Sequence, residues 1–443
     1  MKKKNLFFLL CMFPLALLGQ QNWTLKQCIA YGLENHGNKA IYYNEKLIAD
    51  AKAKEALADY LPKISVNGSF DNNLQVQQSV IPAGAFGPEP RKIAFTQKFN
   101  TNLTAQLDQT IYDQSLLTGL KANKLYSQQS QLNVALSDQD IIYKVGNAFH
   151  QISVYREQVE LLKKNTESYR RQMDVFKAQV EKGVALQKDH DKVKVDYNIV
   201  MSQVFIAESN VKLAENQLKF EMGFPVDSTL VTEKASTDEL EKILSVGIGE
   251  EPAISKRIDY RLAALDVSLL EIDEKRIRNQ ALPKLTAYAK YGAVGFGSTF
   301  SPAFSDLNPF SAIGLKLNIS VFDFFRQSAQ NKQAKYKLIN ARETLKLNDG
   351  KFKMEYENAK TEFLKATTNL SNDRQNIELA EKVFTVTDHQ YKKGVTDLTE
   401  WLNTRNSIKD AQNNYLNSLY TFYTSKLELE KSKGSLQDFY NKL

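Results

Sequence analysis

The sequence has little of what catalytic and metal sites are built from. It holds two cysteines and four histidines. None of His36, His150, His190 and His389 lies in a His-Glu-x-x-His motif or near a cysteine pair, which argues against a zinc site. No glycine-rich phosphate loop precedes a predicted helix, and no Ser-His-Asp set can be inferred. We therefore predict no catalytic residue, no cofactor, no cofactor-binding residue and no metal ligand.

Long hydrophobic runs are also missing. Beyond residue 20 no run of about 18 apolar residues occurs, so no transmembrane helix is expected. The formal charge is +7, and without the three lysines at positions 2–4 it is +4. A charge this small over 443 residues does not suggest nucleic acid as a partner.

The N-terminal segment has the features of a secretory signal. Three lysines at positions 2–4 precede an apolar stretch over residues 6–18, and small or polar residues follow at 19–21. We expect residues 1–20 to be a signal peptide. The exported chain then retains Cys28 as its single cysteine and cannot form an internal disulfide.

The chain contains a copy of itself. Three short motifs recur at offsets of about 221, 210 and 211 residues, in the same order in both halves. Such a repeat indicates a duplicated structural unit. The pairs are Leu61-Pro62-Lys63 with Leu282-Pro283-Lys284, Ile111-Tyr112-Asp113 with Val321-Phe322-Asp323, and Lys182-Gly183-Val184 with Lys393-Gly394-Val395.

Each half carries a long stripe of mostly apolar residues with a period of 3.5, over residues 141–180 and 352–391. This period is typical of coiled-coil packing. Gly183 and Gly394 interrupt the stripes, and a returning stripe follows each glycine. We predict two αα-hairpins with turns at these glycines and with Trp401 packed inside the second tip. The long arms cover residues 114–182 and 325–393, about 100 Å each at ~1.5 Å per residue.

Four other segments alternate strictly between apolar and polar residues, which favours strands with one apolar and one wet face. The pattern fits a membrane β-barrel and also a soluble antiparallel sandwich. The signal peptide and the lack of hydrophobic helices favour the barrel. Nearby aromatics, Phe296, Phe300, Phe304 and Phe310, fit either a membrane girdle or core packing. The predicted strands are 63–80, 95–111, 285–296 and 312–322, with loops at 81–91 and 297–309.

Four strands cannot close a membrane barrel, since the smallest known use about eight and an open edge is not tolerated in lipid. Several chains must therefore pool their strands, and three chains would supply twelve. The helical stripes have no globular core to pack against, so they must pack on one another across hairpins and chains.

This duplicated plan resembles the TolC-like outer-membrane efflux protein family over essentially the whole exported chain. The ordered set of helix, Leu-Pro-Lys, strand, loop, strand and hairpin carries the resemblance in both halves, together with the turn segments 180–184 and 391–398. The resemblance implies a fold that is mainly α with a membrane β-barrel: a homotrimer whose twelve-stranded barrel continues into a periplasmic α-helical barrel. It implies a passive exit duct in the outer membrane, extending into the periplasm. Its implied partners are a periplasmic adaptor, an inner-membrane transporter and outer-membrane lipid.

The same plan predicts the domain boundaries. Each half has a leading helix, a strand pair with an extracellular loop, and a helical hairpin. The predicted segments are 1–20 signal peptide, 21–62 leading helix, 63–113 strands and loop, 114–222 hairpin, 223–250 linker, 251–283 leading helix, 284–324 strands and loop, 325–434 hairpin, and 435–443 tail.

The resemblance also implies a gate at the hairpin turns. Glu400 and Asp189, six residues after the turn glycines, match the family's pore-facing carboxylates, which as a ring would favour cations. Tyr391 and Asp189 match the closed-state latch. A second family acid falls on Asn403 and a basic latch residue on Thr396, so the ring is weaker here and one link is missing. The alternative is that Glu400 and Asp189 are only N-cap or first-turn acids, which the helix dipole favours.

Two other functions remain as alternatives: a non-channel coiled-coil structural protein of the envelope with a β-sandwich head, and an envelope enzyme, which the missing catalytic set makes remote. Within the channel hypothesis, the cargo can be drugs, metal ions or polypeptides.

Overall fold

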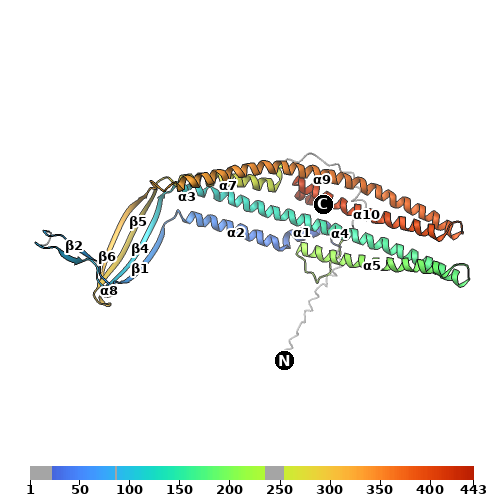
Figure 1. Cartoon of the computed structure of the whole chain (residues 1–443), viewed down its shortest axis with the longest axis horizontal. Coiled ribbons are helices and arrows are strands. Elements are labelled where there is room, and N and C mark those ends of the chain that lie inside the picture. Colours follow the sequence, from blue (N-terminus) through green and yellow to red (C-terminus); the bar gives the residue numbers. More distant parts are fainter. Residues whose placement is uncertain (1–21, 85–86, 235–253) are drawn as a thin grey trace, which may run out of the picture. The chain divides into compact units, whose positions relative to one another are not determined.

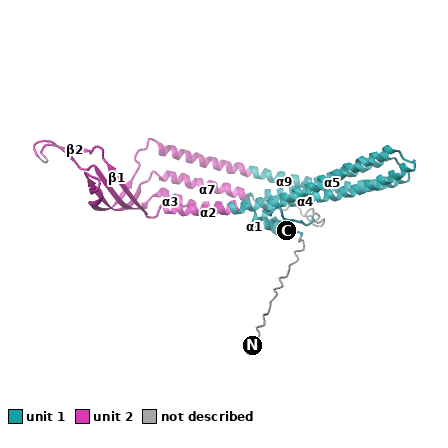
Figure 2. Ribbon diagram, turned by 90° about the horizontal axis from the view of Figure 1, so that it is seen from below, with its two compact units in different colours: residues 1–41, 135–257, 350–443 teal, residues 42–134, 258–349 magenta. Residues whose placement is uncertain are grey.

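The computed structural model describes residues 22–84, 87–234 and 254–443. The predicted signal peptide and residues 235–250 of the predicted linker lie outside these ranges. The chain divides into two compact units, and each unit draws on both halves of the sequence (Figure 2). Unit 1 comprises residues 1–41, 135–257 and 350–443, and unit 2 comprises residues 42–134 and 258–349.

Unit 2 contains an antiparallel four-stranded sheet with two strands from each half (Figure 1). The strands pair in the order β1-β4-β5-β6, which leaves β1 and β6 at the edges. A separate two-stranded ladder, β2 with β3, lies within the first strand-to-strand connection. The bounds are β1 Lys63–Asn72, β2 Gln78–Ile81, β3 Arg91–Ala94, β4 Phe99–Tyr112, β5 Lys284–Gly297 and β6 Leu307–Asn318.

Three of the four strand predictions were wrong by four residues or more at an end. β4 begins at Phe99 and not at residue 95, and β6 begins at Leu307 and not at residue 312. Pairing explains the two strands that were predicted to run too far. The strand predicted over 63–80 stops at Asn72, because β4 begins opposite it at Phe99 and leaves no partner beyond. The strand predicted to end at Phe322 stops at Asn318, because β5 begins opposite it at Lys284. Alternating polarity therefore identified the strands, and the partner strand set their length.

The sheet has one apolar face, most of which the described part of the chain leaves uncovered. Ile64, Leu107, Ala289 and Ile313 lie side by side across the four strands. Ile64 is 72% and Ile313 87% exposed. The opposite face carries polar residues such as Gln106 in the same register. An apolar face this open requires another covering, since burying apolar surface drives association.

The end of the apolar face is covered by the short helix α8 (Pro302–Ser305) and its aromatic neighbours. Phe300 and Phe304 pack on Phe70 of β1, at ring-centroid distances of 5.4 and 5.2 Å. A Cβ on Gly295 would lie 2.1 Å from the Ala303 carbonyl oxygen, so only glycine permits this approach. Phe300 and Phe304 thus form a local aromatic cluster. Phe310 lies on the polar face, over Gly292.

The helices form two long hairpins, α4 with α5 and α9 with α10 (Figure 1). In the described part of the chain, no helix is both long and apolar enough to cross a membrane. The helix bounds are α1 Leu25–Asn35, α2 Gly37–Ala58, α3 Gln114–Leu120, α4 Ala122–Glu181, α5 Gln187–Met222, α7 Ile258–Asn279, α9 Arg326–Lys392, α10 Leu398–Lys433 and α11 Leu436–Lys442, with a 3₁₀ turn at Ile254–Lys256.

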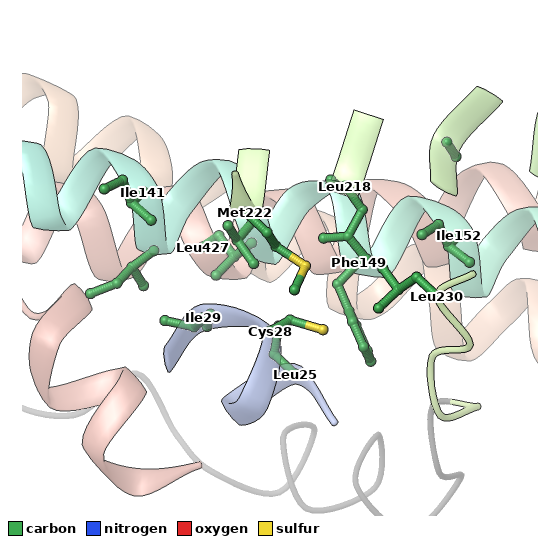
Figure 3. Packing of buried hydrophobic residues seen from close by; sticks show 14 of the residues in the cluster. Leu25, Cys28, Ile29, Ile141, Phe149, Ile152, Leu218, Met222, Leu230 and Leu427 are labelled. Carbon is green, nitrogen blue, oxygen red and sulfur yellow. The ribbon is translucent and has the colours of Figure 1, made fainter. Parts of the chain in front are cut away.

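Unit 1 holds a core in which α1 packs against both hairpins (Figure 3). Cys28 and Ile29 of α1, Ile152 of α4 and Leu218 of α5 are fully buried, and Leu427 of α10 is 1% exposed. Burial raises the pKa of the Cys28 thiol to about 12, so this cysteine is neutral and packs as an apolar residue. The first stripe predicted from the 3.5-residue period contributes to this core, and the second contributes to a separate core of α4, α9 and α10.

His150 of α4 is buried in unit 1 without a partner for one ring nitrogen. Its ring stacks on Tyr423 of α10, with centroids 4.0 Å apart and planes at 6°. Its Nδ1 has no hydrogen-bond partner among the described residues. Burial lowers the pKa of His150 from 6.5 to about 4, so the folded protein holds it neutral.

We predict that His150 makes the protein acid-labile. In the unfolded chain it takes up a proton near pH 6.5, and in the fold only near pH 4. Stability should therefore fall as the pH drops through this interval, by up to about 3 kcal/mol. His150→Phe, which keeps the stacking, should flatten this loss in thermal unfolding followed by circular dichroism. The exposed His389→Phe is the control and should leave the pH profile unchanged, whereas an unchanged profile in His150→Phe contradicts the prediction.

Candidate functional site at the hairpin turns

The two hairpin turns share one backbone geometry. Gly183 and Gly394 have φ values of 72° and 70°, in the left-handed region that favours glycine. The N–H of Val184 donates to the Gln179 carbonyl and that of Val395 to the Gln390 carbonyl, both at 2.9 Å. This is the Schellman arrangement that ends a helix. The turns therefore place the first residues of α5 and α10 in equivalent positions.

The candidate gate acids lie in the first turns of α5 and α10. The Glu400 N–H donates to the side chain of Asp397 at 2.9 Å, so Asp397 is the capping residue. The Glu400 carboxylate is exposed and has no hydrogen bond or ion pair among the described residues. Asp189 is half-buried. The first-turn position by itself favours a carboxylate. At α10, however, Asp397 already caps the helix, so the Glu400 carboxylate does not serve as the cap and stays exposed to solvent.

Tyr391 and Asp189, the candidate latch pair, lie close together within one chain although they belong to different hairpins. The pKa of Tyr391 is raised, first by burial and then by the negative charge of Asp189, and the Gln172 amide opposes the rise. No direct hydrogen bond joins the phenol to the carboxylate among the described side chains. The Tyr391 ring also packs on Phe176 of α4, with centroids 6.0 Å apart.

Trp401 joins the two hairpins behind the turn. It is 1% exposed, which confirms its predicted place inside the tip. Its ring lies 6.0 Å from Tyr169 of α4, 5.6 Å from Phe384 of α9 and 6.4 Å from Tyr391. The residue that follows Glu400 is thus fixed by aromatic packing on both hairpins, which holds the first turn of α10 in place.

Asp388 anchors Trp401 from α9. Its carboxylate accepts a hydrogen bond from the Trp401 indole Nε1 at 3.0 Å and an ion pair from Lys392 Nζ at 2.6 Å. Burial alone would raise the pKa of Asp388. The hydrogen bonds from Lys392 and Trp401, with the charges of Lys392 and Arg405, outweigh burial and lower it.

A buried polar group lies one helical turn further along α10. The Arg405 guanidinium stacks over Tyr169 and Phe384, 5.1 and 4.9 Å from the ring centroids. It donates to the backbone oxygen and Oδ1 of Asn165, at 3.2 and 3.1 Å. Asn165 in turn donates to Gln412 at 2.8 Å. This group fixes the register between α4 and α10, because each buried polar atom has a specific partner.

Asp388 and Arg405 were not singled out from the sequence. Arg405 was detectable: extending the returning stripe backward from Ile408 by steps of three and four gives Arg405 and Trp401. An arginine at an inward position of a coiled coil signals a buried partner. Asp388 carries no such signal, because its partner is the indole N–H of a residue 13 positions away.

The described side chains at the turns offer no covalent chemistry. Across the described chain, His, Cys, Asp and Glu residues nowhere gather in a group of three or more that would hold a metal ion. What the turns present is an exposed carboxylate at Glu400 and a half-buried one at Asp189, in the first turns of α10 and α5.

We predict that Asp388→Asn destabilises the hairpin tips in a pH-dependent way. Because the pKa of Asp388 is lowered on folding, its charge stabilises the fold above about pH 4, and the effect is lost as the pH falls through the lowered value. At neutral pH the substitution should lower stability by about 1–2 kcal/mol, and the difference from the parent should close in acid. Thermal unfolding at several pH values measures this. The exposed Asp174→Asn of α4 is the control and should have no effect, and an equal effect of both substitutions would contradict the assignment.

Comparison with known proteins gives a consistent result. A family model described as "Outer membrane efflux protein" matches residues 48–223 and 253–435. The outer membrane protein TolC of Salmonella enteritidis is 19% identical over 345 residues, which are 76% of this chain and 70% of TolC. The alkaline protease secretion protein AprF of Pseudomonas aeruginosa is 19% identical over 344 residues, with the same coverages. A crystal structure of CusC superposes with a TM-score of 0.76 at 13% identity, covering 93% of this chain and 92% of that chain.

Proposed function

Because this chain belongs to the outer membrane efflux protein family, we propose that it is the passive exit duct of a tripartite export system. The protein is an outer-membrane channel for efflux or secretion that extends into the periplasm, and it is not an enzyme. Family members form trimeric channels that work with adaptor proteins and inner-membrane pumps. For this chain we propose a homotrimer that receives its cargo from an inner-membrane transporter through a periplasmic adaptor.

The observation that supports the duct is the four-stranded sheet with two open edges and an uncovered apolar face. The edge strands β1 and β6 come from opposite halves of the chain. In lipid their unpaired backbone groups must find partners on another copy. Three copies supply twelve strands in the proposed assembly. In a non-channel structural rod, an apolar face this exposed would remain in contact with water, which is unfavourable.

We further propose that the hairpin turns form the gate. Three copies of Glu400 would face one axis and form a ring of negative charge, with Asp189 beside it. The exposed, unpaired carboxylate of Glu400 supports this role. Tyr391 would hold the closed state by its packing on Phe176 and Trp401 and by a hydrogen bond from its neutral phenol to Asp189 of the neighbouring hairpin. Closure here would rest on packing more than on ion pairs, since Thr396 lacks a charge.

Single-channel recording in planar bilayers tests both proposals. The purified protein should give stable steps with a preference for cations in a salt gradient. Glu400→Gln should reduce the cation-to-anion permeability ratio by roughly threefold, because the ring's charge is removed from the narrowest point. Asp189→Asn should have a smaller effect.

The matched control is Glu381→Gln, an exposed acid of α9 about 20 Å before the turn at ~1.5 Å per residue. It should leave selectivity unchanged. Absence of any conductance would overturn the duct. Conductance whose selectivity does not respond to Glu400→Gln would overturn the gate alone.

A further inference from the structure

The two junctions between strand and helix differ in a way that the gate and the pore do not explain. In the first half, Asp113 follows β4 and α3 begins at the next residue. In the second half, Asp323 accepts a hydrogen bond from the Gln327 N–H at 2.8 Å, as a capping residue does. Here, however, Phe324 and Phe325 stand between the aspartate and the start of α9.

Phe324 and Phe325 combine an unfavourable backbone with exposed rings. Their φ angles are 49° and 69°, a region that residues other than glycine rarely adopt. Their side chains are 83% and 75% exposed, and their rings contact that of Phe322, which is itself 67% exposed. Packing within the described chain does not bury these rings.

The exposed rings continue the apolar face of the sheet. Leu315 and Leu317 of β6 are 69% and 60% exposed, and Val321, beyond the end of the strand, is 90% exposed. In an outer-membrane channel this face meets lipid. Because the helices extend into the periplasm, the junction lies at the periplasmic leaflet, where acyl chains give way to headgroups and aromatic residues concentrate.

The start of α9 is strongly basic. Asp323 is the sole acid between residues 307 and 342 in the sequence. Arg326, Lys332, Lys335 and Lys337 are exposed and lie off the buried face that Ala334 and Leu338 mark. These four side chains form no ion pair with any described residue.

The position of these charges fits a headgroup layer. Arg326 and Lys332 are about 9 Å apart along the helix. Lys335 and Lys337 lie further along, and their charges act over a Debye length of about 8 Å. The corresponding stretch of the first half, residues 114–125, carries Lys121 and Lys124 alone. The two junctions therefore differ in both aromatic content and charge.

We propose that residues 321–337, the junction patch, bind anionic phospholipid of the periplasmic leaflet. Val321, Phe322, Phe324 and Phe325 enter the acyl region, and Arg326, Lys332, Lys335 and Lys337 attract the phosphates, in the way that juxtamembrane basic clusters do. The patch selects lipid at the membrane surface of the channel. The proposal is independent of the gate.

Lipid quenching tests the patch in the intact protein. Phe324→Trp and, as a probe of the first junction, Tyr112→Trp are reconstituted with brominated phosphatidylglycerol or brominated phosphatidylcholine at equal mole fraction. Emission is compared with the parent protein. At Phe324→Trp, brominated phosphatidylglycerol should quench the emission about fivefold more strongly than brominated phosphatidylcholine. This is the preference that one fully engaged basic side chain supplies. At Tyr112→Trp both lipids should quench equally.

A triple variant isolates the charges. Lys332→Gln, Lys335→Gln and Lys337→Gln together, in the Phe324→Trp protein, should bring the preference close to one while quenching persists. No quenching by either lipid at Phe324→Trp would overturn the proposal, and would mean that a second copy covers the patch. Equal quenching by both lipids would overturn it too. Conductance of each preparation verifies that the channel has assembled.

Discussion

The structure depends on one constraint: a β-sheet in hydrocarbon cannot have an open edge, because lipid offers no partner to backbone N–H and C=O groups. The chain supplies four strands in one sheet, and among the described residues the outer edges of β1 and β6 have no partner strand. Its apolar face is exposed and its other face is polar. A single chain therefore cannot be the functional unit in a membrane, and assembly of copies is built into the sheet.

The helical hairpins, which lie in water, also depend on packing against other elements. Their cores form where α1, α4, α5 and α10 meet, and further along where α9 packs against α10. Near the turns the contacts become specific: Trp401 and Arg405 bridge the hairpins through aromatic rings, Asp388 and Asn165. Such contacts fix one register between helices whose apolar stripes alone would permit sliding. A charge at Glu400 can act on ions only if the helix that carries it is held in place.

Much of this architecture was predictable from the sequence, because two periodicities record it directly. The 3.5-residue stripes and the glycines at 183 and 394 predicted the hairpins, and alternating polarity predicted the strands. Strand ends at Asn72 and Asn318 were missed, since the partner strand determines them and not the local residues. Asp388 was missed because its role depends on a tertiary hydrogen bond to Trp401. The strained Phe324 and Phe325 were missed because a sequence does not display φ.

The most direct test of the account is covalent linkage between the sheet edges of neighbouring copies. In a Cys28→Ala background, one cysteine at Val66 of β1 is combined in turn with one at each position from Ala312 to Leu317 of β6. A disulfide requires Cα atoms within about 7 Å. The account predicts that adjacent positions in the shared register give covalent trimers on denaturing gels, whereas single-cysteine variants give at most dimers. Monomers at every position of membrane-inserted protein would contradict it.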